Sequence, residues 1–440
     1  MDSMTQSHFD VAVVGAGPAG IAAAVTAAEY GAHVALIDDN PHAGGQIWRG
    51  EFRDTAHGTN HGTASRWYKR LSRSGATVIA GARVFHIADR TLAAETADGV
   101  RRISCTELIL ATGARELFLP FPSWTLPNVL GAGGLQGLMK SGLPVEGKRI
   151  VVAGTGPLLL AVAAYARKRG AKVLGICEQT STRKLMRFTM AAAAVPSKIA
   201  DAARFVWSLR GIPHWTNSWV AAASGNGRVE RVRVVRGGET REIECDYLAC
   251  GFHLVPNVEL AKMAGCKIEN GFVAVDAMQR TSATRVYCAG EPTSIGGVEM
   301  AVLEGRIAGY AAAGNEGAAR QLFRERAVYA KFAEELKSAF ALRPELKSLA
   351  ALDTLLCRCE DVPFGQARAF DSWRAAKLHT RCGMGPCQGR VCGAAAEFLF
   401  GWSADSVRPP AVPVECASLA GIAARATRSA GSEAGLGRQG

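Results

Sequence analysis

The chain has 440 residues, of which 48% are hydrophobic and 20% are charged, and its formal net charge is +12 at pH 7. The length allows two or three domains with large cores, and the composition excludes a disordered protein. The basic residues are scattered, without a Lys/Arg run or an aromatic–basic motif, so we expect a solvated basic surface and no nucleic-acid partner. Docking on an acidic partner protein is the weaker alternative.

The first ten residues, "MDSMTQSHFD", are polar and lack the basic and apolar regions of a signal peptide. The apolar run at residues 157–166 is shorter than a membrane span, and Arg167 and Lys168 follow it. We therefore expect no integral membrane segment and a cytoplasmic location. In that reducing compartment, the twelve cysteines are expected to be ligands or buried thiols rather than disulfides.

Residues 9–38 predict a complete dinucleotide-binding unit. The apolar run "FDVAVV" is typical of a buried parallel strand, "GAGPAG" follows it, and a helix then ends at Gly31. A second strand, "HVALID", ends in an acid that can accept hydrogen bonds from a ribose. The glycines allow a tight turn, close approach of a pyrophosphate, and close packing of the helix on the strand. The predicted nucleotide-binding residues are Gly15, Gly17, Pro18, Ala19, Gly20 and Asp38.

Three later segments resemble flavoproteins of the glutathione-reductase type. "GGQIWR" resembles a stretch that lies beside the flavin, and "ELILATGARE" resembles the strand end that returns the chain between domains. "RVYCAGEPTSIGGVEMAVLEGRIAG" resembles the closing motif, whose acid binds the flavin ribitol; that acid is usually aspartate and here is glutamate. The order and spacing of the three segments imply FAD as the cofactor. The residues assigned by this resemblance are Gly45, Gln46, Ala111, Thr112, Gly113, Gly290 and Glu291.

Residues 147–178 repeat the plan of strand, glycine turn, helix, strand and acid. The turn contains Gly154 and Gly156, and the acid is Glu178. Such a repeat places NAD(P)H in two-dinucleotide reductases, but the third glycine position holds Leu159, which should push the helix away from the strand. We expect the fold to be kept, with NAD(P), an adenine nucleotide or nothing in the site. Residues 247–257 are predicted to include the strand that closes this domain.

Six cysteines before the C-terminal region argue against a dithiol–disulfide reductase. They contain no C-x-x-C pair, and Cys245 and Cys250, although spaced as C-x4-C, flank the closing strand rather than the flavin motifs. Most of the six stand in apolar strand-like runs, which favours buried small side chains. These cysteines are Cys105, Cys177, Cys245, Cys250, Cys266 and Cys288.

The C-terminal region concentrates five cysteines in "CRCEDV" and "TRCGMGPCQGRVC". A C-x-C pair and a C-x4-C pair present four thiolates from two loops, as a [2Fe-2S] cluster requires, and the neighbouring glycines let backbone N–H groups approach its sulfurs. Zinc is the competing metal, and purely structural cysteines are the third alternative. We predict that Cys382 is not a ligand. The predicted ligands are Cys357, Cys359, Cys387 and Cys392.

The two cysteine motifs, together with "VRPPAVPV", "GGQIWR" and "GTGPLLLA", resemble the α subunits of heteromeric amine and imino-acid dehydrogenases. That family includes opine oxidase, D-hydroxyproline dehydrogenase, hydrogen cyanide synthase and, in larger form, sarcosine oxidase, and its C-terminal module is of the bacterioferritin-associated-ferredoxin type. The resemblance covers about residues 8–415. It implies a partner β subunit of the D-amino-acid-oxidase type, with its own FAD and the substrate pocket, and often an FMN between the subunits.

The predicted fold class is α/β, with two nested Rossmann-like domains of the glutathione-reductase type and a small helical [2Fe-2S] domain. We predict a discontinuous FAD domain at residues 1–115 and 271–315 and a second nucleotide-binding-like domain at residues 116–270. A helical linker at residues 316–345 leads to the cluster domain at residues 346–405. The tail comprises residues 406–440, and its last part, "AARATRSAGSEAGLGRQG" at residues 423–440, is small, polar and aperiodic, which favours disorder there.

The sequence and the resemblance together predict an electron-transferring subunit of an enzyme that oxidises a C–N bond in an amino acid, imino acid or opine. No base or carboxylate clamp for such a substrate can be assigned in this chain, which is consistent with a substrate site on the partner. Two alternatives stay open: a self-sufficient NAD(P)H-dependent flavin and iron–sulfur reductase, and a docking or regulatory iron–sulfur protein without redox turnover. The particular substrate and the electron acceptor are not predicted.

Overall fold

The computed structural model describes residues 6–50, 62–193, 195–403 and 407–420. It divides the chain into two compact units. Unit 1 comprises Met1–Gly113, Pro256–Arg326 and Ser406–Gly440, and unit 2 comprises Ala114–Val255 and Ala327–Asp405. The final part of the predicted tail, residues 421–440, lies outside the described residues.

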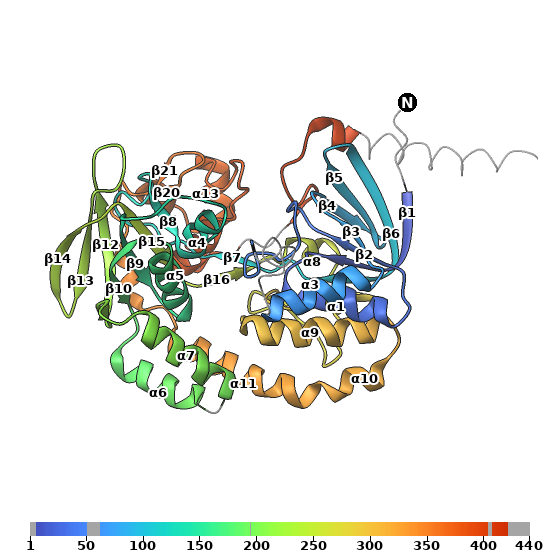
Figure 1. Cartoon of the computed structure of the whole chain (residues 1–440). Coiled ribbons are helices and arrows are strands. Elements are labelled where there is room, and N and C mark those ends of the chain that lie inside the picture. Colours follow the sequence, from blue (N-terminus) through green and yellow to red (C-terminus); the bar gives the residue numbers. More distant parts are fainter. Residues whose placement is uncertain (1–5, 51–61, 194, 404–406, 421–440) are drawn as a thin grey trace, which may run out of the picture. The chain divides into compact units, whose positions relative to one another are not determined.

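Unit 1 is built on a seven-stranded sheet of order β3-β2-β1-β6-β5-β4, with β19 paired to β6 (Figure 1). The central strands are parallel, with Val13 opposite both Leu36 and Ile109, and all four residues of β2 are buried. Such uniformly apolar strands require cover on both faces. The strands are β1 (Gln6–Val14), β2 (Val34–Ile37), β3 (Thr77–Ile79), β4 (Arg83–Ala88), β5 (Thr91–Thr96), β6 (Gly99–Leu110) and β19 (Val286–Cys288).

Two helices of unit 1 pack unusually closely against each other: α1 (Pro18–Glu29) and α9 (Gly297–Ala312) (Figure 1). A Cβ atom at Gly305 would lie 2.1 Å from the Ala19 carbonyl oxygen, so only glycine permits this approach. The small side chains of "PAGIAAAVTAAE" in α1 make the same contact possible from the other side. The remaining elements are α3 (Thr63–Arg73), α8 (Glu259–Met263), β17 (Ile268–Glu269), β18 (Phe272–Val273) and α10 (Glu316–Gln321).

Residues 256–270, which we expected in the second nucleotide fold, pack in unit 1. Ala261 and Cys266 are buried in the same core as strands β4, β5 and β6. The chain therefore returns to unit 1 directly after the closing strand of the second fold, about fifteen residues earlier than the motif spacing suggested.

Unit 2 contains a five-stranded parallel sheet of order β11-β10-β9-β15-β8. An antiparallel sheet of order β12-β13-β14 packs its apolar residues into the same core. The elements are β7 (Ala114–Glu116), β8 (Val129–Gly131), α4 (Ala132–Lys140), β9 (Arg149–Gly154), α5 (Pro157–Lys168), β10 (Lys172–Glu178), α6 (Thr182–Ala192), α7 (Pro196–Ser208), β11 (His214–Trp215), β12 (Ser218–Ser224), β13 (Arg231–Arg236), β14 (Glu239–Glu244), β15 (Tyr247–Gly251) and β16 (Leu254–Pro256).

Leu159 does not disrupt the second fold. Its side chain is buried in the core formed by α5, β9 and β15. A Cβ atom at Gly251 of β15 would lie 3.2 Å from the Leu159 Cδ2 atom, so the glycine on the neighbouring strand provides the room that the third glycine of the turn would otherwise give. The two Rossmann-like folds predicted from the sequence are confirmed.

The C-terminal part of unit 2 is a small, mostly helical module. Its core is formed by few apolar side chains and three thiols, those of Cys357, Cys382 and Cys392. So small a core gives limited hydrophobic stabilisation, which favours a bound metal or cluster as an additional stabilising group. The elements are α11 (Phe323–Ala339), which begins in unit 1, η1 (Pro344–Ser348), β20 (Leu355–Cys357), β21 (Val362–Pro363), α12 (Phe364–Arg368), α13 (Trp373–Thr380) and α14 (Cys392–Phe400).

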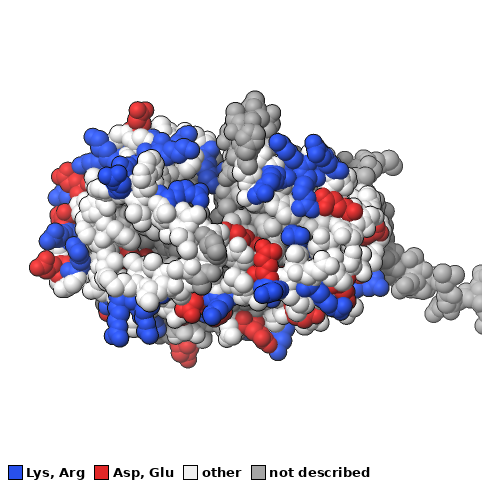
Figure 2. All heavy atoms as spheres, turned by 60° about the horizontal axis from the view of Figure 1, so that its bottom comes forward, with Lys and Arg blue, Asp and Glu red and all other residues white. Residues whose placement is uncertain are grey.

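On the face drawn in Figure 2, Lys and Arg side chains form several separate groups, with Asp and Glu side chains between them. This distribution agrees with the scattered basic residues of the sequence. In the parts of the chain that the structure covers, every helix is too short or too polar to cross a membrane.

Candidate functional sites

The first glycine turn, between β1 and α1, has the form of a phosphate cradle. Gly15 has a φ of +102°, and a Cβ atom there would lie 2.2 Å from the Ala111 carbonyl oxygen; a Cβ at Gly20 would lie 1.7 Å from the Gly15 carbonyl oxygen. A Cβ at Gly17, by contrast, would meet nothing within 4 Å. Two glycines are thus required for packing, while the third faces open space at the N-terminus of α1, where a pyrophosphate would bind.

The acid after β2 is held against the same turn. Asp38 is 8% exposed, and its carboxylate accepts hydrogen bonds from the backbone N–H of Ala16 and, at 2.8 Å, from that of Asn40. Pro18 begins α1, where its missing N–H costs no helical hydrogen bond. These contacts fix the acid beside the turn, as a ribose-binding role requires.

The predicted flavin loop folds onto the glycine turn. The Gly44 N–H donates to the Ala16 carbonyl at 2.7 Å, and a Cβ at Gly45 would lie 3.0 Å from the Gly17 Cα atom. The Tyr68 hydroxyl of α3 donates to the Trp48 carbonyl oxygen at 3.1 Å and so holds the loop against α3. Gln46 is exposed in this loop. The structure therefore brings residues 44–46 to the phosphate cradle.

The strand end after β6 and the closing motif meet at the same edge of the sheet. Thr112 donates its hydroxyl to the Asn257 carbonyl at 2.6 Å, and the Asn257 amide donates back to the Thr112 carbonyl at 2.9 Å. A Cβ at Gly113 would lie 3.8 Å from a carboxylate oxygen of Glu291. Gly290 approaches Ala19 so closely that a Cβ there would lie 2.8 Å from the alanine Cβ. These predicted residues therefore come together in unit 1.

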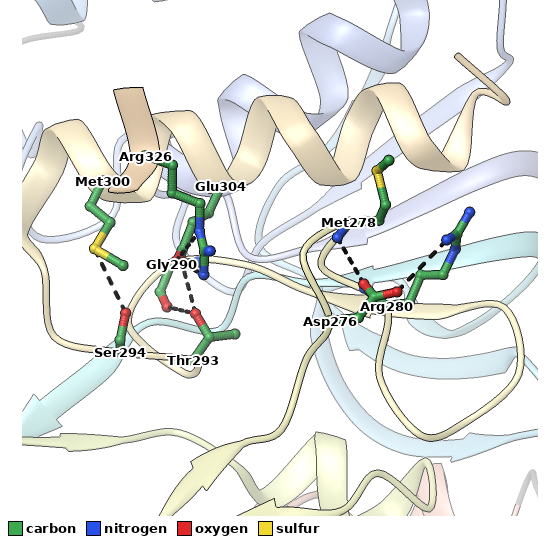
Figure 3. Close-up of polar contacts among 9 residues, drawn as sticks. All are labelled: Asp276, Met278, Arg280, Gly290, Thr293, Ser294, Met300, Glu304 and Arg326. Carbon is green, nitrogen blue, oxygen red and sulfur yellow. Dashed lines mark hydrogen bonds and ion pairs between the residues drawn. The ribbon is translucent and has the colours of Figure 1, made fainter. Parts of the chain in front are cut away.

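A buried carboxylate that the sequence analysis missed positions the closing motif (Figure 3). Glu304 of α9 is fully buried, and one of its oxygens accepts the Gly290 N–H and the Thr293 hydroxyl, each at 2.9 Å. Its other oxygen accepts hydrogen bonds from the Arg326 guanidinium, the shorter at 3.2 Å. Burial raises the pKa of Glu304 and the Arg326 charge lowers it. Glu304 thus ties the turn that carries Glu291 to α9.

The carboxylate of the acid in the second nucleotide fold has hydrogen-bond donors from the glycine turn and from the chain just after β10. Glu178 is 3% exposed, and its oxygens accept the Gly156 N–H, the Thr155 hydroxyl and the Thr180 N–H, each at 2.8 Å. Burial raises the pKa of this carboxyl, while these hydrogen bonds lower it. A Cβ at Gly156 would meet nothing within 4 Å, so this turn also opens to space.

The chain after α11 covers the neighbouring strand ends of this second fold. The Gln179 amide donates to the Ala341 carbonyl at 3.2 Å and accepts the Arg343 N–H at 3.0 Å. On the far side of β9, His253 lies 2.8 Å from the Phe340 carbonyl oxygen, and Phe340 is buried. The segment 339–343 therefore spans from the end of β10 to beyond the end of β15, across the edge where a dinucleotide would lie.

Five cysteines of the C-terminal module gather in two groups. The sulfurs of Cys357, Cys382 and Cys392 lie within 4.8 Å of one another, and all three residues are buried. Cys359 and Cys387 are partly exposed, and their thiols contact each other. Hydrogen bonds from the Cys382 and Cys392 thiols lower the pKa of Cys357. The structure thus places Cys382 beside two of the four predicted ligands, Cys357 and Cys392, although the pair spacing led us to leave this residue aside.

The glycines of "RCGMGPCQGRVC" are required by this packing. A Cβ at Gly385 would lie 2.4 Å from the Cys359 Cβ, and a Cβ at Gly383 would lie 2.5 Å from the Trp373 ring. The Gly383 N–H points to the Cys357 sulfur at 3.5 Å. Glycine therefore lets the loop enclose the thiols, and one backbone N–H already approaches a sulfur.

The residues fit both expected groups. The open space at Gly17, with Asp38 and Glu291 at the same edge, suits a dinucleotide such as FAD. Two separate groups of thiols suit a two-iron cluster, because each iron of a [2Fe-2S] cluster takes two thiolates.

Comparison with known proteins defines the class. Residues 9–317 match the family described as pyridine nucleotide-disulphide oxidoreductase. The chain belongs to this family of flavoprotein oxidoreductases, and family membership implies FAD binding.

Individual relatives narrow the class further. The chain is 31% identical to an opine oxidase subunit of Rhizobium meliloti (strain 1021), over 94% of this chain and 99% of that protein. It is 29% identical to the HcnB subunit of hydrogen cyanide synthase from Pseudomonas aeruginosa, over 86% and 90%. The crystal structure of L-proline dehydrogenase from P. horikoshii shares the fold, with a TM-score of 0.67 and 20% identity over 95% of this chain and 81% of that one. The resemblance inferred from the motifs is confirmed.

Proposed function

We propose that this chain is the electron-transferring flavin and iron–sulfur subunit of a heteromeric dehydrogenase or oxidase that acts on the C–N bond of an amino acid, imino acid or opine. The observation that carries the proposal is the presence in one chain of an open glycine turn in unit 1 and of two groups of thiols, three and two, in unit 2. Similarity to an opine oxidase subunit over 99% of that protein supports the assignment of substrate class.

The residues have distinct parts in this function. In this function Gly17 admits the pyrophosphate, Asp38 binds a ribose and Glu291 binds the ribitol chain; the open space at Gly17 and the position of Asp38 against the glycine turn support these roles. The ligands of the cluster are Cys357, Cys359, Cys387 and Cys392. When bound, FAD exchanges electron pairs and a [2Fe-2S] cluster exchanges single electrons, so a protein that holds both can pass a substrate's electron pair on one electron at a time.

The substrate site belongs to a partner β subunit, and the motif resemblance favours the D-amino-acid-oxidase type for it; in the family that the motifs resemble, an FMN often lies between the two subunits. Two relatives support the existence of a partner subunit, because each is named as one subunit of a larger enzyme: opine oxidase in one case and hydrogen cyanide synthase in the other. The second nucleotide fold does not serve as an NAD(P)H site, because the segment 339–343 bonds to both sides of the edge where NAD(P)H would bind.

The test compares the full chain alone with the chain co-expressed with the protein encoded beside it. Both are assayed with opines, D-hydroxyproline, proline, glycine and sarcosine, and with an artificial electron acceptor. We expect turnover of one of these substrates by the complex and none by the chain alone. Turnover by the isolated chain at the rate of the complex would place the active site here and contradict the proposal.

A further inference from the structure

The module in unit 2 offers five thiols, one more than a [2Fe-2S] cluster binds. The additional thiol, that of Cys382, lies in the packed core of the module and not at the surface. Cys382 is fully buried, its sulfur lies within 4.8 Å of the Cys357 and Cys392 sulfurs, and it packs in the core with Leu356 and Ala395. The inference below rests on the proposed iron–sulfur cluster.

The two groups of thiols divide naturally between two irons. Each iron of a [2Fe-2S] cluster has two bridging sulfides and takes two thiolates. Cys359 and Cys387, which contact each other, suit one iron. The other iron has three thiols within reach, of which it can bind two. One member of the buried group therefore remains a neighbour of the cluster.

Helix polarity and hydrogen bonding indicate which thiol remains. Cys392 is the first residue of α14, where the positive end of the helix dipole favours a thiolate. Cys357 receives the Gly383 N–H, a donor of the kind that surrounds coordinated sulfur. Cys382 follows the C-terminal end of α13, directly after the left-handed Arg381, where the dipole disfavours a thiolate.

We propose that Cys357 and Cys392 bind one iron, that Cys359 and Cys387 bind the other, and that Cys382 keeps its proton and donates one hydrogen bond to a coordinated sulfur, that of Cys357 or of Cys392. Such a donor stabilises the reduced cluster, which carries one more negative charge, and so raises its reduction potential. Cys382 is therefore a positioning and potential-setting residue. Its complete burial keeps water from replacing it as the donor.

The test uses the full chain, purified anaerobically, with three variants. Cys382→Ala should keep two irons and two sulfides per chain and shift the cluster's midpoint potential to a lower value in an EPR-monitored redox titration. Cys382→Ser, whose hydroxyl still donates, should restore part of that shift. Cys416→Ala, at an exposed cysteine of unit 1, is the matched control and should leave both the iron content and the potential unchanged.

Three results would overturn the inference. Loss of iron in Cys382→Ala, from a variant that still binds FAD, would make Cys382 a ligand. An unchanged potential in Cys382→Ala would make it a passive core residue. Zinc in place of iron in the wild-type protein would remove the cluster itself, and with it the proposed function; the first two results would leave that function standing.

Discussion

We expect nucleotide binding in unit 1 to depend most directly on Gly17. Its hydrogen atom faces the space that a pyrophosphate would fill, whereas Gly15 and Gly20 face backbone atoms. Gly17→Val should therefore abolish FAD binding without disturbing the packing of α1 on β1, because the new side chain occupies the phosphate position. The flavin content of the purified protein, read from its visible spectrum after heat release, measures this effect.

Gly156→Val is the matched control, because Gly156 holds the corresponding open position in the second fold. Its φ of +94° makes any side chain strained, so some loss of stability is expected there. FAD should nevertheless remain bound. Release of FAD by the Gly156 substitution, with retention in Gly17→Val, would reverse the assignment of the two sites.

Glu304 should couple FAD binding to the stability of unit 1. Glu304→Gln removes the negative charge opposite Arg326 and places an amide N–H near the Gly290 N–H or the guanidinium, both of which are donors. Removing one partner of a buried ion pair lowers the free energy of unfolding by about 3 kcal/mol, so the denaturant midpoint should fall. The dissociation constant for FAD, titrated into the apoprotein, should rise because the turn that carries Glu291 is released.

Thr293→Val separates the two effects, because it removes the hydroxyl that lies 2.9 Å from the Glu304 carboxylate and 2.8 Å from the Gly290 carbonyl oxygen, and leaves the Arg326 pair intact. It should weaken FAD binding with a smaller loss of stability, about 1 kcal/mol for a single hydrogen bond. An FAD affinity that is unchanged in both variants would show that Glu304 stabilises the fold alone.

The positions of the glycine-turn residues could be predicted because their contacts are local. Gly15, Gly17 and Asp38 lie within one βαβ unit, and their spacing along the chain is enough to predict where each stands relative to the turn. Glu304 and Cys382 could not be predicted in the same way. A glutamate within "VLEGRIAG" is typical of an exposed helix position, and its burial depends on Arg326, which lies 22 residues away. Cys382 fits neither pair spacing, and only the folded loop places it against Cys357.

At the scale of elements, the residues that follow α11 cover the strand ends where the second nucleotide fold would bind a dinucleotide. The segment 339–343 bonds to Gln179 and Thr180 after β10 and to His253 after β15. We expect neither NADH nor NADPH to show saturable binding in calorimetry, and neither to bleach the flavin in stopped-flow absorbance. Rapid flavin reduction by NADH would contradict this interpretation and favour a self-sufficient reductase.

The same segment should contribute to the stability of unit 2. Gln179 is fully buried, and its amide bonds to Ala341, Arg343 and Thr155. Gln179→Ala leaves buried backbone groups without partners and should lower the free energy of unfolding by about 1–3 kcal/mol. Chemical denaturation followed by circular dichroism measures this loss. An unchanged free energy of unfolding in Gln179→Ala would show that these hydrogen bonds do not hold the segment on the strand ends.

The elements of both nucleotide folds were predicted well, because strand, glycine turn and helix follow one another in each. Leu159 was expected to spoil the second turn, and the sequence around it gives no sign of the compensation. Gly251, which makes room for the leucine, lies on a strand about ninety residues later. Pairing of β15 with β9 brings the two together, and that pairing is a tertiary feature.

At the scale of the whole molecule, the flavin cradle and the thiols belong to different units. Cys387→Ser should therefore lose the iron of the cluster and retain FAD, because Gly17 and Cys387 belong to different compact units with separate cores. Metal analysis and the flavin spectrum of one preparation give both quantities. Loss of FAD together with iron would show that the two sites depend on each other for folding.

The return of residues 256–270 to unit 1 shows where prediction of the whole molecule ends. The closing strand of the second fold is visible in the sequence, but the point at which the chain leaves it depends on which core accepts Ala261 and Cys266. Small and apolar residues of this kind fit either core. A partner subunit cannot be inferred from the residues of this chain, and only the similarity to subunits of larger enzymes indicates one.

In the proposed function, this one chain holds both a two-electron flavin and a one-electron iron–sulfur cluster. The most direct measurement is an anaerobic reductive titration of the purified full chain, followed in the visible spectrum and by EPR. We expect uptake of three electrons per chain, two by the flavin and one by an EPR-active cluster. Complete reduction with two electrons, no EPR signal and stoichiometric zinc would contradict it.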